Sequence, residues 1–436
     1  MGRTPVDSTI KPNSRLLPLV AGTLLLLQLA WPNRAWVILI VILGGGWGLS
    51  YLWARSLRKG LHLDREVRYG WVQVGDRLEQ RFTVKNKNWA PALWLEVDDR
   101  SNLPGYAASR VTAVDGDGTR QWSIAGTCSR RGLFQLGPTC LRCGDPLGLF
   151  NVELQSPETS VLLVLPPVLP IPHIEIAAGG RAGESRRERR SAFETTVSVD
   201  TVREYLPGDP LRAIHWPTSA RREKLYIRQF EHTPSSDWWI FLDLEGKVQI
   251  GEGADSTIEH GVILAASLAD QGLREGHAVG FVTFSGKELC LIPARHQSGQ
   301  LMDILRSLAM VTLGEASLSK LLEITHHSMR GGASLILITA NIDQGWVPAL
   351  TQAKKMGVSP TVFLLDPVSF GGSNSPIQMS NLLTRNGIVH SLIHRELLNR
   401  LETHPGRQGL WEWMPGGWGK GQPMHRPENT DWRRLG

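Results

Sequence analysis

Two apolar segments near the amino terminus constrain this chain more than any other feature of its sequence. Residues 16–31 are almost entirely apolar, residues 35–53 carry no charge, and residues 32–34 separate them. At ~1.5 Å of rise per residue, helices of these lengths reach about 24 and 28 Å, close to the ~30 Å hydrocarbon core of a bilayer. The pattern predicts a transmembrane hairpin of two helices over residues 16–54. A signal peptide and a helical hairpin inside a soluble core are the alternatives.

Lysine and arginine residues beside the hairpin predict its orientation, because such residues are enriched on the cytoplasmic side. The turn carries only Arg34, whereas basic residues flank the hairpin on both sides: Arg3, Lys11, Arg15, Arg55, Arg58, Lys59, Arg65 and Arg68. We expect a multi-pass protein of the cell membrane, with the lipid bilayer as the partner of residues 16–54. Residues 1–15 form a cytoplasmic amino-terminal segment, and both termini and the soluble domains lie in the cytoplasm. The four cysteines fit a reducing compartment.

Short alternating runs replace the apolar segments from residue 60 to residue 172. Turn signals such as Val74-Gly75-Asp76 separate these runs. The pattern predicts an antiparallel β-sandwich-like domain over residues 60–172. Its strands are expected at residues 69–74, 78–85, 92–97, 119–124, 139–142 and 160–165.

Cysteines in this domain raise the question of a metal site. Cys140 and Cys143 form a Cys-x-x-Cys pair with Cys128 nearby, whereas Cys290 is distant in sequence and no histidine lies close. A structural zinc site normally has four ligands. Small buried side chains in a strand are therefore the preferred interpretation over zinc binding.

Two segments are expected to lack a packed core. Residues 173–200 form a basic linker with the sequence GGRAGESRRERR at 179–190, and residues 404–436 form a disordered tail rich in Gly, Pro and Trp. The linker could contact anionic lipid, and the tail tryptophans could contact a partner or the bilayer interface. No zinc-finger or helix-turn-helix pattern accompanies the basic residues, so no specific nucleic acid binding is expected.

The most specific motif of the chain reads REYLPGDPLRAIHWPTSARREKLYIRQFE and occupies residues 203–231. Asp209 is a good helix N-cap, which predicts a short helix over residues 211–216. Pro217 lacks an N–H group and is expected to end that helix. Residues 224–231 alternate with the period of a strand.

This segment resembles the family called domain of unknown function 58. The matching residues are Glu204, Tyr205, Pro207, Gly208, Asp209, Arg212, Ile214, His215, Trp216, Ser219, Ala220, Arg221, Arg228, Phe230 and Glu231. Three upstream motifs are also similar to the family: Arg130-Arg131-Gly132, Leu136-Gly137-Pro138 and residues 145–150. The resemblance implies a bacterial-type, membrane-anchored protein with a von Willebrand factor A-like domain. It also implies a partner, because family members are commonly encoded beside MoxR-type AAA+ ATPases.

Strand and helix patterns alternate beyond residue 237. Strands are expected at residues 238–244, 278–284, 334–339 and 361–365, and helices at 258–273, 300–310, 318–329 and 347–356. This alternation predicts a parallel sheet covered by helices on both faces. The resemblance implies that residues 237–403 form a von Willebrand A-like (Rossmann-type) α/β domain. The expected fold class is therefore multidomain: a two-helix transmembrane hairpin, an antiparallel β-sandwich-like domain and this α/β domain.

Ligands bind such open sheets beyond the carboxyl ends of the strands, where Asp243 follows the first strand. Similarity to von Willebrand A domains implies a divalent cation held by an Asp-x-Ser-x-Ser loop, with a Thr and an Asp from later loops. Here Glu245 and Lys247 replace the two serines, and the later loop has Thr339 but no Asp before Asp343. Lys247 would repel Mg²⁺ and could neutralise Asp243. Asp243 is thus a metal-ligand candidate in a degenerate loop, and no metal or cofactor is predicted.

Residues 201–236 have three interpretations. Their charged and aromatic side chains could clamp the two folded domains together, or form a docking surface, since Arg, Trp and Tyr dominate binding hot spots. Alternatively, Asp209 and His215 could act as an acid/base pair. The candidates for the clamp or docking surface are Glu204, Tyr205, Pro207, Gly208, Asp209, Arg212, His215, Trp216, Arg221, Arg228 and Glu231. The chain has no G-x-S-x-G, H-E-x-x-H or Walker A sequence, so no catalytic residue is assigned.

The leading hypothesis is a membrane-anchored, non-enzymatic adaptor that works with a MoxR-type AAA+ ATPase in the assembly or maturation of a client. The alternative is a membrane-associated, hydrolase-like enzyme that uses Asp209 and His215. A metal-dependent adhesion module is a third hypothesis, and both the cytoplasmic orientation and Lys247 argue against it.

Overall fold

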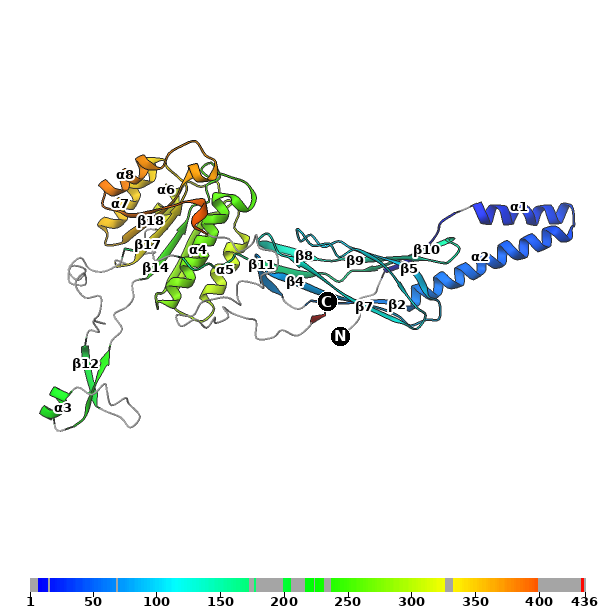
Figure 1. The fold of residues 1–436 in the computed structure, drawn as a ribbon, viewed down its shortest axis with the longest axis horizontal. Helices are drawn as coiled ribbons and strands as arrows, with labels where there is room; N and C mark the ends of the chain where they lie inside the picture. Colours follow the sequence, from blue (N-terminus) through cyan, green and yellow to red (C-terminus); the bar gives the residue numbers. More distant parts are fainter. Residues whose placement is uncertain are drawn as a thin grey trace. The chain divides into compact units, whose positions relative to one another are not determined.

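The chain of 436 residues divides into two compact units in a computed structural model. One unit contains Met1–Pro167 with Arg400–Gly436, and the other contains Val168–Asn399 (Figure 1). The structure describes residues 7–14, 16–67, 70–171, 176–177, 199–204, 216–222, 224–230, 237–325, 332–398 and 433–434. Most of the predicted linker and tail therefore lie outside the described residues.

Two helices follow the apolar pattern of the sequence. These are α1 (Leu16–Ala30) and α2 (Arg34–Gly60), and Figure 1 shows them side by side. The amide oxygen of Asn33 accepts a 3.0 Å hydrogen bond from the N–H of Ala35 and so caps α2. Among the described residues, α2 alone is long and apolar enough to cross a membrane, because α1 has only 15 residues.

The last turns of α2 belong to the β-rich unit. The helix continues past its predicted end at residue 54 as far as Gly60, and its Ala54 and Leu57 side chains are fully buried in an apolar core. Arg58 and Lys59 lie in the last turn, where cations are favoured by the helix dipole. The helix is thus built into the domain that follows it.

The β-rich unit contains three sheets, in the orders β1-β10-β9-β5-β6, β20-β2-β4-β7 and β3-β11-β8. The strands are β1 (Asp7–Pro12), β2 (Leu61–Val67), β3 (Trp71–Gln73), β4 (Arg77–Asn86), β5 (Ala92–Asp99), β6 (Arg110–Val114), β7 (Thr119–Thr127), β8 (Gly132–Leu136), β9 (Thr139–Gly144), β10 (Phe150–Ser156), β11 (Ser160–Leu165) and β20 (Arg433–Arg434). The predicted β-rich domain is confirmed. One correction concerns strand direction, because β3 and β11 pair in parallel whereas the other pairs of this unit are antiparallel.

Inside the predicted β-rich domain, β2, β6, β8 and β10 lie outside the strand ranges that the sequence analysis expected, and two further strands lie outside the predicted domain itself. β1 falls in the expected amino-terminal segment, and it pairs with β10 at the edge of its sheet. β20 falls in the tail that was expected to be disordered, and it pairs with β2. Both pairings join residues far apart in the sequence, so no local pattern signals them.

A buried ion pair connects two sheets of this unit. Arg65 Nη1 on β2 lies 2.7 Å from Asp99 Oδ1 on β5, and the two side chains are 2% and 1% exposed. Arg65 also donates 2.8 Å hydrogen bonds to Thr139 and Gln80. Although Arg65 was counted among the basic residues that orient the hairpin, its charge is neutralised inside the protein.

The second unit is built on a six-stranded sheet in the order β16-β15-β14-β17-β18-β19. Its strands are β14 (Trp238–Leu242), β15 (Val279–Ser285), β16 (Glu288–Arg295), β17 (Ser334–Thr339), β18 (Ser359–Leu365) and β19 (Val389–Ile393). All neighbours are parallel except β15 and β16. In chain order the arrangement is 3-2-1-4-5-6, the order of a doubly wound α/β fold.

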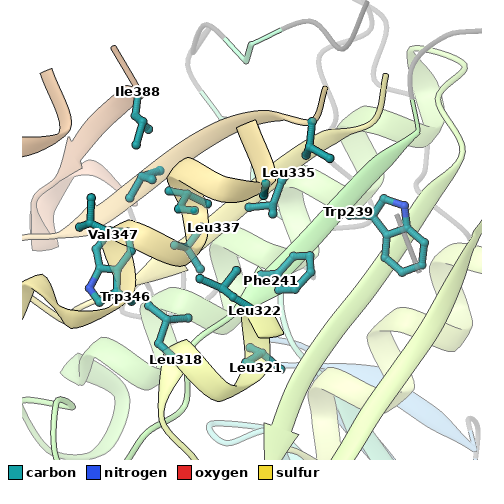
Figure 2. Close-up of a cluster of buried hydrophobic side chains, with 14 of the residues drawn as sticks. Trp239, Phe241, Leu318, Leu321, Leu322, Leu335, Leu337, Trp346, Val347 and Ile388 are labelled. Carbon is teal, nitrogen blue, oxygen red and sulfur yellow. The ribbon is translucent and has the colours of Figure 1, made fainter. Parts of the chain in front are cut away.

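Helices cover both faces of this sheet, as the alternation of patterns predicts (Figure 1). They are α4 (Thr257–Arg274), α5 (Gln300–Met310), α6 (Leu318–Thr325), α7 (Val347–Lys355) and α8 (Ile377–Arg385), and short 3-10 helices occupy Gly253–Asp255, Gln344–Trp346, Pro367–Phe370 and Arg395–Leu397. Figure 2 shows side chains of α6 and α7 packed against Phe241, Leu335 and Leu337 of the sheet. On the opposite face, Gly261 of α4 approaches Leu242 and Ile338.

A separate two-stranded ladder carries the motif of residues 203–231. β12 (Val199–Glu204) pairs with β13 (Tyr226–Phe230), and α3 (Trp216–Arg222) lies between them in sequence. The strand expected at residues 224–231 is present. The expectation that Pro217 ends a helix is wrong, because Pro217 lies in the first turn of α3. Proline fits that turn, since its missing N–H would have no partner within the helix there.

Candidate functional site

The carboxyl ends of β14 and β17 meet at the point where the strand order of the parallel sheet reverses. β14 pairs with β15 on one side and with β17 on the other, and the crossovers from these two strands lead to opposite edges of the sheet. Doubly wound sheets bind ligands at this switch point. Asp243 and Thr339 lie there, so the geometry brings together two residues that the sequence analysis connected with a cation site.

The carboxylate of Asp243 has partners for both oxygens. Thr339 Oγ1 donates a 2.6 Å hydrogen bond to Oδ2, and the N–H of Glu245 donates a 3.1 Å hydrogen bond to Oδ1. Burial raises the pKa of Asp243 from 3.8 to about 6, although these two hydrogen bonds act in the opposite direction. Asp243 is therefore a buried carboxyl group that local protein donors already satisfy.

Backbone hydrogen bonds close the loop that follows Asp243. The N–H of Gly246 donates to the carbonyl of Gly314 at 2.9 Å, and the N–H of Gly314 donates to the carbonyl of Leu244 at 2.7 Å. A Cβ atom on Gly314 would lie 2.8 Å from the carbonyl oxygen of Phe284, so this close approach requires glycine. The loop is thus fixed to the segment that precedes α6.

The residues at this switch point do not fit a divalent cation. The buried carboxylate of this loop is that of Asp243, and both of its oxygens accept hydrogen bonds. Asn341 lies in the later loop, in which the cation site would need an Asp. Its side-chain oxygen accepts a 2.8 Å hydrogen bond from the N–H of Asp343. Lys247 is exposed, and across the described part of the chain no three His, Cys, Asp or Glu side chains gather into a metal-binding group. This donor set favours a structural role for Asp243.

An Asp–His pair at the same edge of the sheet was missed by the sequence analysis. Asp366 follows β18, and its Oδ2 lies 2.9 Å from Nδ1 of His394, which follows β19. The other carboxylate oxygen accepts a 3.1 Å hydrogen bond from the N–H of Val368. An Asp directly after a buried strand was the available signal, but β19 was not predicted. The pair ties the ends of two neighbouring strands.

The cysteines lie in separate surroundings. Cys143 is buried in one apolar core of the β-rich unit and Cys128 in another, while Cys140 Sγ donates a 3.4 Å hydrogen bond to Glu153. Burial raises the pKa of Cys128 and Cys143 to about 12 and that of Cys140 to about 11. These thiols are small core side chains, and their positions do not converge on a common ligand.

The motif of residues 203–231 is described only in part. Ser219 Oγ accepts a 2.9 Å hydrogen bond from the N–H of Tyr226, which ties α3 to the start of β13. Arg222 lies 5.4 Å from the centre of the Tyr226 ring, and Arg221 is exposed on α3. Seven candidates lie outside the described residues: Tyr205, Pro207, Gly208, Asp209, Arg212, His215 and Glu231. For Glu204, Trp216 and Arg228 only the backbone is described, so the clamp, docking and acid/base interpretations stay predictions.

Comparison with solved structures gives low overall similarity. One of the matches is the SpRpn10 VWA domain, with a TM-score of 0.27 and 11% sequence identity over 40% of this chain and 98% of that chain. This score carries no argument about function.

Sequence comparison finds relatives of part of the chain and one matching family model. "Uncharacterized protein YeaD" of Bacillus subtilis is 24% identical over 263 residues, which cover 59% of this chain and 63% of the relative. "Uncharacterized protein Rv1480" of Mycobacterium tuberculosis is 23% identical over 126 residues, 29% of this chain and 40% of the relative. The matches thus span less than two thirds of these relatives. Residues 201–368 match the family model described as "Protein of unknown function DUF58".

Proposed function

We propose that this protein is a membrane-anchored, non-enzymatic adaptor that works with a MoxR-type AAA+ ATPase in the assembly or maturation of a client. The hydrogen bond between Thr339 and Asp243 is the observation that carries the proposal. These two side chains occupy the position at which a doubly wound sheet ordinarily binds its ligand. A domain whose ligand edge is occupied by its own side chains is suited to presenting a surface to another protein.

The anchor in this proposal is a hairpin in which both α1 and α2 cross the bilayer. The apolar side chains of both helices are largely exposed, as in Leu19, Leu26, Ile38 and Val41, which water would not favour. Lys and Arg flank the hairpin, so the α/β domain is placed in the cytoplasm. This orientation gives a cytoplasmic ATPase access to the domain.

Thiol labelling in intact cells tests the orientation. Met310 on α5 is 55% exposed, so Met310→Cys supplies a reactive thiol on the α/β domain in a Cys290→Ser background. A membrane-impermeant maleimide should label this thiol only after the cells are permeabilised. Equal labelling before and after permeabilisation would place the domain outside the cell and overturn the proposed topology.

Affinity purification from detergent-solubilised membranes tests the partner. Arg221 is exposed on α3, and Arg212 and His215 belong to the same motif. We expect the wild-type protein to retain an AAA+ ATPase, and the Arg212→Ala, His215→Ala and Arg221→Ala variants to retain less. Arg385→Ala, at the end of α8, is the matched control and should bind as the wild type does. Recovery of no ATPase with the wild-type protein would contradict the adaptor function.

A further inference from the structure

We infer that the end of the β-rich unit next to α2 is itself a bilayer-binding surface. Four exposed apolar side chains form it, and we name them the apolar collar: Trp89, Leu93, Trp94 and Leu147. The inference rests on the proposed membrane anchor. It goes further, because it assigns lipid contact to loops of the folded domain in addition to the helices.

Both helices are attached to this end of the β-rich unit. Before α1, Asn13 donates hydrogen bonds from its backbone N–H to Leu149 at 2.8 Å and from its side chain to Gly148 at 3.1 Å. On α2, the indole of Trp53 donates to the carbonyl of Pro91 at 3.2 Å. Asn88 donates a 2.8 Å hydrogen bond to the carbonyl of Ser56. The loops that carry the collar are therefore held beside the helix.

A tight turn presents Leu147 at the tip of the loop between β9 and β10. The Asp145 carboxylate accepts hydrogen bonds from the N–H groups of Leu147 at 3.0 Å and Phe150 at 2.6 Å. Gly148 has a φ of 67°, which glycine adopts without strain. The Leu147 side chain is left 63% exposed. The motif of residues 145–150 thus folds into a turn that leaves an apolar side chain exposed.

The height of Leu147 along α2 places it within reach of lipid. A span of about 20 residues that begins at Arg34 ends near residue 53. The Cδ1 atom of Leu147 lies 3.9 Å from the position that a Cβ atom on Gly46 would take. Gly46 precedes the end of that span by about two helical turns. Leu147 therefore extends from the folded domain to a level ~10 Å inside the end of that span, within the hydrocarbon core.

Aromatic side chains surround α2 at its exit from the span. Trp89 packs edge-on against Trp53, with ring centres 5.2 Å apart. Trp47 and Tyr51 pack against Phe150 at 5.5 and 5.7 Å. Tryptophan and tyrosine are enriched at membrane interfaces, where an apolar ring and a polar group are both solvated.

An irregularity in β5 adds two adjacent residues to the collar. Pairing between β5 and β6 shifts register between Ala92 and Leu95, and the intervening Leu93 and Trp94 are 56% and 40% exposed. A regular strand would turn one of two adjacent side chains to the core. Trp94 lies beside Gly144, at the start of the loop that carries Leu147.

Basic side chains beside the collar identify a lipid surface as its occupant. Arg55, Arg58 and Lys59 on α2 and Lys87 on the neighbouring loop are exposed. At the end of a membrane span, such residues lie at the level of anionic headgroups, which attract them. Three kinds of side chain follow one another along α2 toward its carboxyl end: the apolar Leu147 beside Gly46, then the aromatic rings, then the cations. This order is expected for a surface immersed in the bilayer interface.

Depth-dependent fluorescence quenching of the full chain in liposomes tests the inference. We place a thiol at the collar with Leu147→Cys and, in a second protein, Leu93→Cys, both in the Cys290→Ser background. The matched control is Leu133→Cys, because Leu133 is similarly exposed, at 57%. Leu133 lies on β8, which connects to the end of β9 opposite Gly144 and therefore opposite the collar. Each protein carries an environment-sensitive dye in phosphatidylcholine and phosphatidylglycerol liposomes, with or without lipid spin-labelled near the headgroup.

We expect the dye at positions 147 and 93 to be quenched several-fold more than the dye at position 133. Flotation of the same samples separates this inference from the proposed anchor. Protein that floats with the liposomes but shows equal quenching at all three positions would overturn the collar and leave the anchor standing. Protein that does not float would overturn both.

Discussion

Thr339 and Asp243 are joined by a 2.6 Å hydrogen bond across the switch point of the sheet, although they lie 96 positions apart in the sequence. Thr339 also accepts a 2.9 Å hydrogen bond at Oγ1 from the N–H of Asn341. The threonine hydroxyl therefore acts as donor to the carboxylate and as acceptor for its own loop. This arrangement fixes two loops with side chains that a ligand would otherwise engage.

Asp243→Asn should remove a pH dependence of stability. Because burial raises the pKa of Asp243 from 3.8 to about 6, the folded protein holds this proton more tightly than the unfolded chain. Its contribution to the free energy of unfolding is thus highest below about pH 4 and is lost as the pH rises through about 6. At ~1.4 kcal/mol per pKa unit, the variant should gain up to roughly 3 kcal/mol over the wild type between these limits.

Denaturant unfolding of the detergent-solubilised protein at several pH values measures this gain. Asp303→Asn is the control, because Asp303 is 62% exposed on α5 and should give no such trend. A difference between Asp243→Asn and the wild type that stays constant from pH 4 to 7 would contradict the assignment.

Magnesium should leave the unfolding temperature of the wild-type protein unchanged. The Asp243 oxygens already accept hydrogen bonds from Thr339 and Glu245, so binding the ion would require breaking them. Differential scanning fluorimetry in Mg²⁺ and in chelator makes the comparison. A magnesium-dependent rise that disappears in Asp243→Ala would show that the site holds the cation after all.

Arg65→Met should destabilise the β-rich unit by about 3–5 kcal/mol, because it leaves the buried carboxylate of Asp99 without its cation. The double variant Arg65→Met, Asp99→Leu removes both charges and should lose less stability than the single variant. Denaturant unfolding followed by tryptophan fluorescence measures both. A double variant that loses as much stability as Arg65→Met, or more, would rule out a coupled ion pair.

Native alkylation at pH 8 should modify Cys290 before the other cysteines. Thiolate is the reactive form, and burial holds the pKa of Cys128, Cys140 and Cys143 at about 11 to 12. Burial raises the pKa of Cys290 as well, but its side chain is only partly buried and is therefore more accessible to the reagent. Peptide mass spectrometry before and after denaturation gives the order of modification. Rapid reaction of Cys140 or Cys143 in the folded protein would contradict their burial.

The local sequence pattern was sufficient to predict elements in which the pattern of buried residues is regular along their length. The apolar runs Trp238–Leu242 and Ser334–Thr339 formed central strands, and the amphipathic helix Gln300–Met310 was predicted with its observed bounds. Both edge strands of the α/β sheet, β16 and β19, were missed. β16 is an edge strand that contains Pro293, and proline weakens a strand pattern.

The sequence by itself determined the apolar hairpin region, the β-rich and α/β parts and the family motif, because periodicity and turn chemistry are local properties. Only the tertiary structure decided that Thr339 satisfies Asp243, that Arg65 is buried against Asp99, and that Leu147 stands beside Gly46. Each of these relationships depends on which strands become neighbours and on the close approach of distant loops. Such long-range contacts are fixed by the packing of the whole domain and leave no periodic trace in the chain.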